Sequence, residues 1–193
     1  AFPIAKIGGE SLAEQIVSQW ITKDKKKLPL YFPMVFDSIS LKKAWHFAGN
    51  ELMKMVENGE RVVFLSLGDI SLFSTGSYVL MEFKRNFPEC AIELIPGITS
   101  YSAVAAKSGL PLAIQSEQLL VLPVPASSSS LKALLKEAVS IGRVIVLLKL
   151  GDKWSWVRPL LESLDLLESS IFAENVGFLE EQIMKASDVP SPN

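Results

Sequence analysis

Short apolar runs rich in branched side chains recur along the chain and alternate with segments of helical spacing. Runs of this length and composition are typical of buried β-strands. The clearest helical stripe starts at Leu41 and ends at Met55, with Asn58-Gly59 behind it as a stop signal. The pattern therefore predicts a long helix followed by strands. The predicted strands cover residues 62–65, 92–95, 119–122 and 144–148.

This alternation of strands and helices predicts an α/β fold with mainly parallel sheets covered by helices. In such folds ligands bind beyond the carboxyl ends of the strands. A further helix is expected from about Thr99 to Lys107, and another from near Leu131, capped by the serines before it. The extended stretch after Gly109 suggests a boundary between an N-terminal domain, residues 1–113, and a C-terminal domain, residues 114–193.

Composition narrows the class of protein. A chain of 193 residues with 49% apolar and 21% charged residues is typical of a folded globular protein and can hold two small α/β domains. No apolar stretch is long enough to cross a membrane and no secretory signal opens the chain, so we expect a cytoplasmic protein without a membrane partner. A net charge of −2 gives no general attraction to nucleic acid. Cys90, as the single cysteine, excludes internal disulfides and multi-cysteine metal sites, and we expect no metal.

Two strand ends carry residues suited to binding a ligand. Gly68 and Asp69 follow the strand predicted near residues 61–67, where glycine allows close approach to the backbone and the carboxylate can accept hydrogen bonds. Gly-Asp is also common turn chemistry. The second strand end, residues 95–100, runs into a helix of small residues. There Thr99 and Ser100 could either cap the helix or present hydroxyls to a cofactor.

Taken together, the two loops resemble a known family. Gly-Asp-Ile-Ser-Leu-Phe-Ser-Thr at residues 68–75 and Ile-Pro-Gly-Ile-Thr-Ser at residues 95–100 are similar to motifs of the tetrapyrrole methylases of cobalamin biosynthesis. Within this family the chain is most similar to precorrin-2 and cobalt-factor-II C-20-methyltransferases, with further matching segments at residues 2–6, 31–34 and 148–151. The likeness covers nearly the whole chain. Family members have an additional first strand with a Gly-Pro-Gly-Asp loop and a further last strand, so we expect a truncated version.

The resemblance implies two α/β domains with S-adenosylmethionine in the cleft between them and a tetrapyrrole in a trough of the N-terminal domain. It also implies a homodimer that methylates precorrin-2 at C-20 to give precorrin-3A. Matching positions imply a cofactor site made from both domains. Its implied members are Gly68, Asp69, Leu72, Ser74, Thr75, Thr99, Ser100, Leu150 and Glu174.

The resemblance identifies the residues that bind substrate less clearly than those that bind the cofactor. The implied candidates are Lys6, Asp37, Phe73 and Lys149. Each lysine could equally be an ordinary surface cation, and Asp37 could equally be the residue at which the helix begins. The chain has Ile70 where the family usually has proline and Phe73 where it usually has tyrosine, so a hydroxyl is missing from the loop.

The catalytic chemistry leaves several readings open. Methyl transfer to carbon requires alignment and exclusion of water rather than a protein nucleophile, and the sequence identifies no residue that accepts the released proton. The metal-free and the cobalt-containing ring are both possible substrates, as is a different tetrapyrrole methylated by a sister enzyme. The alternative from another class is a nucleotide-binding α/β domain without catalysis.

Overall fold

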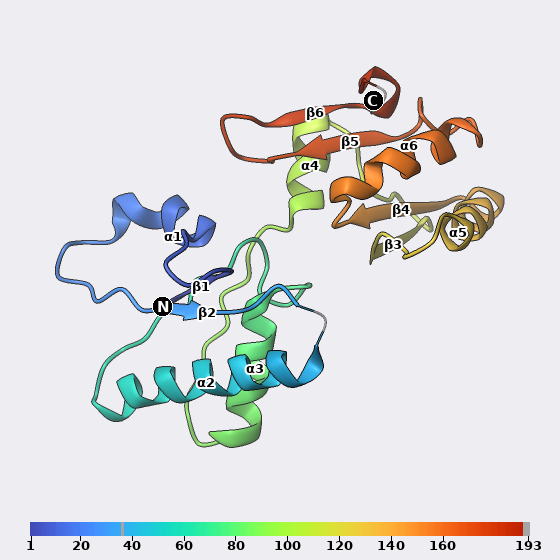
Figure 1. The fold of residues 1–193 in the computed structure, drawn as a ribbon. Coiled ribbons are helices and arrows are strands. Elements are labelled where there is room, and N and C mark those ends of the chain that lie inside the picture. Colours follow the sequence, from blue (N-terminus) through green and yellow to red (C-terminus); the bar gives the residue numbers. More distant parts are fainter. Residues whose placement is uncertain (36, 191–193) are drawn as a thin grey trace. The chain divides into compact units, whose positions relative to one another are not determined.

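The computed structural model describes residues 1–35 and 37–190, which form two compact units, Ala1–Thr99 and Ser100–Asn193 (Figure 1). Both units combine helices with strands, which confirms the predicted α/β class. The second unit includes the helix that begins at Ser100, because that helix packs on the last strand of the chain. The domain boundary expected after residue 113 stays a prediction. Within the part of the chain that the structure describes, no helix has the length and apolarity to cross a membrane.

The N-terminal unit is built on a short parallel strand pair. In chain order its elements are β1 (Phe2–Ile4), α1 (Leu12–Val17), η1 (Ser18–Trp20), β2 (Pro29–Tyr31), α2 (Ser38–Glu57) and α3 (Thr75–Asn86). β1 and β2 pair in parallel with Pro3 opposite Leu30.

Helices α2 and α3 bury the core of this unit. The helical stripe predicted from the sequence is the buried face of α2, where Ala48 is fully buried and Leu52 almost so. These residues pack with Leu30 from β2 and with Val79 and Phe83 from α3. α2 ends at Glu57, immediately before the Asn58-Gly59 stop signal, as expected.

Two predicted strands are wrong. Residues 61–66 and 91–99 lie in neither a strand nor a helix. The backbone of residues 61–67 meets that of Ala1 in two hydrogen bonds, from Ala1 N to Val63 O (2.7 Å) and from Leu65 N to Ala1 O (2.9 Å). A strand needs a continuous ladder of such bonds with a neighbour. An apolar pattern shows the composition of a strand but not whether a partner strand lies beside it.

The C-terminal unit contains one parallel and one antiparallel strand pair. Its elements are α4 (Ser100–Ser108), β3 (Gln118–Pro123), α5 (Ser128–Ile141), β4 (Arg143–Leu148), η2 (Gly151–Lys153), α6 (Trp154–Glu162), β5 (Ile171–Glu174), β6 (Gln182–Lys185) and η3 (Ala186–Asp188). β3 and β4 pair in parallel, which confirms the strands predicted at residues 119–122 and 144–148. β5 and β6 form an antiparallel hairpin.

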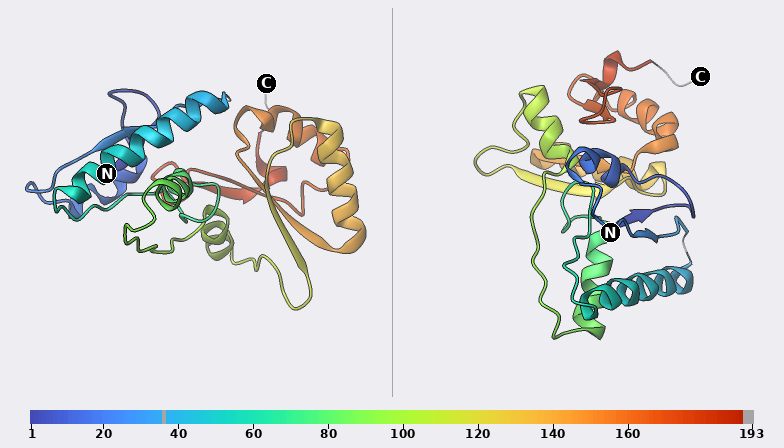
Figure 2. Two further views of the ribbon diagram at one scale, coloured as in Figure 1. Left: turned by 90° about the horizontal axis from the view of Figure 1, so that it is seen from below. Right: turned by 90° about the vertical axis from the view of Figure 1, so that its left-hand side faces the viewer.

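Helices α5 and α6 share the core of the C-terminal unit with β4. Figure 2 shows the ribbon of this unit from two further sides. Leu131 from α5 and Val157 from α6 are almost completely buried, and Ile145 from β4 packs against the same cluster. The serine run before α5 caps it as expected, because Ser127 Oγ accepts a hydrogen bond from Ser130 N.

Candidate functional site

The two loops singled out in the sequence touch each other through their backbones. A Cβ atom placed on Gly97 would lie 2.1 Å from the carbonyl oxygen of Gly68, and 3.3 Å from Cα of Asp69. No side chain fits in that space, so only glycine permits this approach. Gly68 itself has a φ of 71°, a left-handed conformation that glycine adopts without strain. The structure therefore brings the residues 68–75 loop and the residues 95–98 loop into one site.

The Asp69 carboxylate joins the two loops by hydrogen bonds. Its Oδ2 accepts a hydrogen bond from Gly97 N (2.8 Å), and its Oδ1 accepts one from Ser71 N (2.8 Å). The hydroxyl of Ser71 also donates to Oδ1. One carboxylate thus holds the turn of its own loop and the amide of the second loop at once.

These hydrogen bonds keep Asp69 ionised. The Ser71 hydroxyl, followed by the amides of Gly97 and Ser71, lowers the pKa of Asp69 below its ordinary value. A carboxylate with a depressed pKa stabilises the fold above its ordinary pKa, and the contribution is lost as the pH falls through the folded value. At neutral pH the site therefore carries a fixed negative charge.

Ser74 and Thr75 lie at the start of α3. Ser74 is buried, and its Oγ accepts a hydrogen bond from Gly76 N (3.1 Å) and pairs with Ser66 Oγ. This is N-cap chemistry, which satisfies an amide that the first helical turn leaves free. Ser74 thus stabilises the end of the loop by capping α3. A direct contact of Ser74 or Thr75 with a cofactor stays a prediction.

The middle of the first loop is partly exposed. Leu72 N approaches Asp69 O at 3.4 Å and closes the turn. Phe73 follows with a φ of 49°, and 46% of its surface is exposed. Ile70, which stands where relatives usually have proline, accepts a hydrogen bond on its carbonyl from Ser77 Oγ (2.6 Å). This bond anchors the loop to α3.

Asp37 begins helix α2. Its carboxylate accepts hydrogen bonds from Ile39 N (3.2 Å) and Ser40 N (2.8 Å). Ser40, through its side chain and its amide, and then the amide of Ile39 lower the pKa of Asp37. Of the two readings of the sequence, the structure supports the helix-entry residue, and a role in binding substrate stays a prediction.

The capping role of Asp37 gives a first testable expectation. Asp37→Ala should lower the melting temperature by about 2–4 °C. Asp37→Ser should have a melting temperature close to that of the parent chain, because serine is also a good N-cap. Thermal unfolding followed by circular dichroism at pH 7 measures both. Equal melting temperatures for Asp37→Ala and the parent chain would contradict the assignment.

The lysine candidates are exposed. Lys6 lies in the turn after β1, where its carbonyl accepts a hydrogen bond from Gly9 N (2.9 Å). Lys149 follows β4 with a φ of 58°, and Leu150 beside it packs against the C-terminal core. Leu150 therefore contributes to packing, and contacts of all three residues with ligands stay predictions.

The remaining cofactor candidates lie at element ends. Thr99 ends the N-terminal unit and Ser100 begins α4. Glu174 is exposed at the end of β5, opposite Gln182 of β6. Contacts of Thr99, Ser100 and Glu174 with a cofactor stay predictions.

Reasoning from the sequence did not single out two residues that matter to this geometry. Gly97 makes the close approach and Ser71 supplies two donors to Asp69. Both lie inside the quoted motifs. The signal for Ser71 was its position two residues after an aspartate, which is the spacing of an Asx turn. No pattern in the sequence around Gly97 or Gly68 indicates that the two residues are in contact.

Comparisons with known proteins identify the chain's relatives. The family model for Tetrapyrrole (Corrin/Porphyrin) Methylases matches residues 4–188. A cobalt-precorrin-2 C(20)-methyltransferase from Salmonella typhimurium is 31% identical over 180 residues, which cover 93% of this chain and 73% of that protein. A probable cobalt-precorrin-2 C(20)-methyltransferase from Methanocaldococcus jannaschii is 38% identical over 122 residues, 63% of this chain and 50% of that protein.

The fold has a solved counterpart. The crystal structure of the methyltransferase CobJ matches with a TM-score of 0.58 and 18% identity, covering 98% of this chain and 77% of that one. This likeness shows a shared fold. The family match over residues 4–188 and the relative of 31% identity mean that this chain belongs to the tetrapyrrole methylase family of S-adenosylmethionine-dependent methyltransferases.

Proposed function

We propose that this chain methylates the precorrin-2 ring at C-20, giving precorrin-3A, as a step of cobalamin biosynthesis. The observation that carries the proposal is the joined pair of loops, in which the Asp69 carboxylate binds the amide of Gly97. This arrangement occurs within motifs typical of the family. The names of the Salmonella typhimurium and Methanocaldococcus jannaschii relatives support methylation at C-20.

The chemistry of the loops suits the proposed cofactor. S-adenosylmethionine supplies a methyl group on a positively charged sulfur, and it also carries an ammonium and ribose hydroxyls. Ionised Asp69 offers about four lone-pair positions, of which Ser71 and Gly97 use three. One position on Oδ2 thus remains for a hydroxyl or a cation. Gly68, Leu72 and the start of α3 would bring backbone close to the same ligand.

Four further residues are proposed for the cofactor site. Thr99, Ser100, Leu150 and Glu174 would complete the binding site. Matching positions in the family support this assignment. Leu150 lies two residues after β4 and Glu174 is the last residue of β5. Ligands of α/β proteins are expected at the carboxyl ends of strands.

The chain's residues would act on the substrate through position and charge. The precorrin ring carries several carboxylate arms, for which Lys6 and Lys149 are exposed cations at element ends. Phe73 would offer a flat apolar surface from the cofactor loop itself. Alignment of the ring carbon with the methyl group in a site that excludes water is sufficient for transfer, so no residue needs to form a covalent intermediate.

A second candidate substrate is the cobalt-containing ring. Both relatives described above carry cobalt-precorrin-2 in their names, which favours this form. The same loops would serve either substrate, because the cofactor side of the reaction does not change.

One experiment separates these readings. The chain is incubated with S-adenosylmethionine and either precorrin-2 or its cobalt complex, and the product is analysed by mass spectrometry and carbon NMR. We expect a mass gain of one methyl group with the new carbon at C-20. A methyl group at another position would identify a sister methylase. Failure to bind S-adenosylmethionine in calorimetry, with the fold intact, would exclude the methylase function for this chain.

Location and assembly belong to the same proposal. We propose a cytoplasmic homodimer, as is usual for this family. Analytical ultracentrifugation at micromolar concentration tests the assembly, and a purely monomeric species across the concentration range would contradict it.

A further inference from the structure

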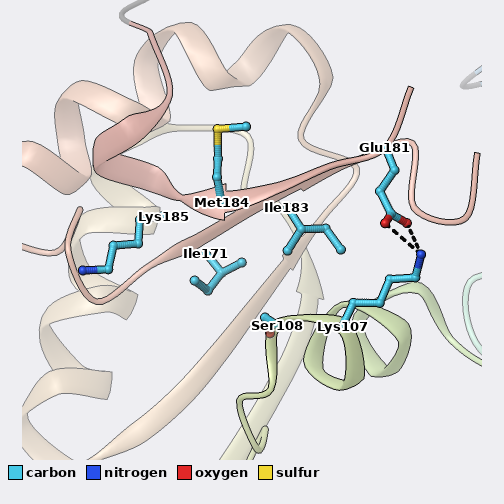
Figure 3. Close-up of a pocket in the computed structure, with 7 residues that line it drawn as sticks. All are labelled: Lys107, Ser108, Ile171, Glu181, Ile183, Met184 and Lys185. Atoms are coloured by element: carbon cyan, nitrogen blue, oxygen red, sulfur yellow. Dashed lines mark hydrogen bonds and ion pairs between the residues drawn. The ribbon is translucent and has the colours of Figure 1, made fainter. Parts of the chain in front are cut away.

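Glu181 connects helix α4 to the turn between β5 and β6 (Figure 3). Lys107 Nζ, near the end of α4, donates to both carboxylate oxygens of Glu181 at 2.7 and 2.6 Å. The same Oε2 accepts a hydrogen bond from Gly177 N at 2.5 Å. One carboxylate therefore links a helix side chain to the backbone of a turn far along the sequence.

This turn directly follows Glu174, one of the proposed cofactor residues. Asn175 and Gly177 both have positive φ, 51° and 89°, so the chain reverses tightly. Further bonds run from Phe178 N to Asn175 O (3.0 Å) and from Glu181 N to Phe178 O (3.2 Å). The Glu181 carboxylate closes this series of bonds. Its loss would release the backbone next to Glu174.

α4 contacts β6 of the hairpin beside a cavity. A cavity of about 610 Å³ lies beside α4, and Ile171 and Ile183 from the hairpin line it together with Ser108 from α4. Figure 3 shows Lys107 reaching along this cavity to Glu181 at the edge of the hairpin. The Lys107–Glu181 pair therefore bridges α4 and the hairpin at this cavity.

The pair is suited to positioning rather than to overall stability. Exposed fractions are 48% for the Lys107 side chain and 24% for that of Glu181. Ion pairs at the surface add little to the free energy of unfolding. The hydrogen bond from Lys107, and then that from Gly177, lowers the pKa of Glu181, so the contact persists above the ordinary carboxyl pKa and is lost as the pH falls through the folded value.

We propose that Lys107 and Glu181 are positioning residues of the cofactor site, which hold the β5–β6 turn next to Glu174 in register with α4, the helix that begins at Ser100. The inference rests on the proposed function, since Ser100 and Glu174 are cofactor residues only within that proposal. A rigid helix of nine residues transmits a constraint on Lys107 to its first residue. The pair thereby fixes two cofactor-facing segments with one contact.

Two measurements test this coupling. Hydrogen exchange of the cofactor-free protein reports the order of residues 175–181 and of α4, and calorimetry reports the affinity for S-adenosylmethionine. The variants are Glu181→Gln and Lys107→Met, with Lys107→Arg as the conservative replacement. The control is Glu168→Gln, which breaks the Lys185–Glu168 pair (3.0 Å) at the other end of the same hairpin.

We expect faster exchange in both segments and affinity lower by about threefold to tenfold for Glu181→Gln and Lys107→Met. Lys107→Arg should retain the parent affinity, because arginine still donates to the carboxylate. Glu168→Gln should leave exchange near Glu174 and cofactor affinity unchanged, and all variants should melt near the parent temperature.

The outcomes distinguish this inference from the proposed function. If the variants showed faster hydrogen exchange only in the turn and not in α4, the coupling between these two segments would be overturned, whether or not cofactor binds. Affinity within twofold of the parent despite faster exchange would overturn the positioning role. A parent chain that does not bind S-adenosylmethionine would contradict the cofactor role of Glu174 and Ser100, while the exchange data would still decide whether the pair couples the two segments.

Discussion

Gly97→Ala is expected to separate the two loops and to weaken cofactor binding by at least about tenfold. The added Cβ would lie 2.1 Å from Gly68 O, a backbone atom that cannot rotate away. Overpacking of this kind costs about 1–3 kcal/mol, and a loss of 1.4 kcal/mol in binding corresponds to a factor of ten. The melting temperature should also fall by about 3–10 °C. Calorimetry with S-adenosylhomocysteine and thermal unfolding measure the two effects.

Gly109→Ala is the matched control for this substitution. Gly109 has a φ of 68° and no atom within 4 Å of the added Cβ, so alanine there introduces backbone strain of about 1 kcal/mol without a clash. Gly97 has no positive φ, and its substitution tests the clash alone. If Gly97→Ala bound cofactor as well as Gly109→Ala does, the contact between the loops would not matter for binding.

Asp69→Asn is expected to lower affinity for S-adenosylmethionine by about 10- to 100-fold. Asparagine keeps the size of the side chain but removes the charge, and its amide nitrogen cannot accept the hydrogen bonds that the carboxylate receives from Ser71 and Gly97. Because the pKa of Asp69 lies below its ordinary value, the Asp69 contribution to affinity should stay constant between about pH 5 and pH 8. Calorimetry across this range measures both expectations.

Asp24→Asn is the control for Asp69→Asn, because it removes the same charge at another position. Asp24 is an exposed residue in which hydrogen bonds from Thr22 and then Lys25 lower the pKa to about 2. It lies outside both loops, so its substitution should leave affinity unchanged. Equal affinities for Asp69→Asn and Asp24→Asn would show that the carboxylate only shapes the loop and that its charge is not needed. A loss that appears only above pH 7 would indicate that a different group titrates.

Local features of the fold were predictable from the sequence because local interactions determine them. The stripe on α2 requires only helical spacing. Ser127 begins α5 through its side-chain oxygen, and Gly142 ends it with a left-handed backbone. β3 and β4 are continuous apolar runs joined by a helix, a pattern that favours parallel pairing. The family resemblance then selected residues 68–75 and residues 95–100 as the candidate site.

The rest depended on contacts between distant segments. Residues 62–65 and 92–95 carry the composition of strands, yet strand formation also requires a partner, which composition does not specify. The fit of Gly97 against Gly68 O is a relation of two backbones 29 residues apart, and the Lys107–Glu181 pair spans 74 residues. Each of these residue types is common at the surface. Only their placement in the folded chain gives them a role.

The left-handed backbone of Phe73 and Lys149 has a consequence for directed evolution. Both residues have φ values, 49° and 58°, at which glycine is about 1–2 kcal/mol more favourable than a residue with a side chain. A selection for thermostability alone would therefore enrich glycine at both positions. The same selection would remove a phenyl ring and an ammonium group from the ends of two proposed ligand loops. Stabilised variants that carry these glycines would expose a conflict between heat resistance and substrate recognition.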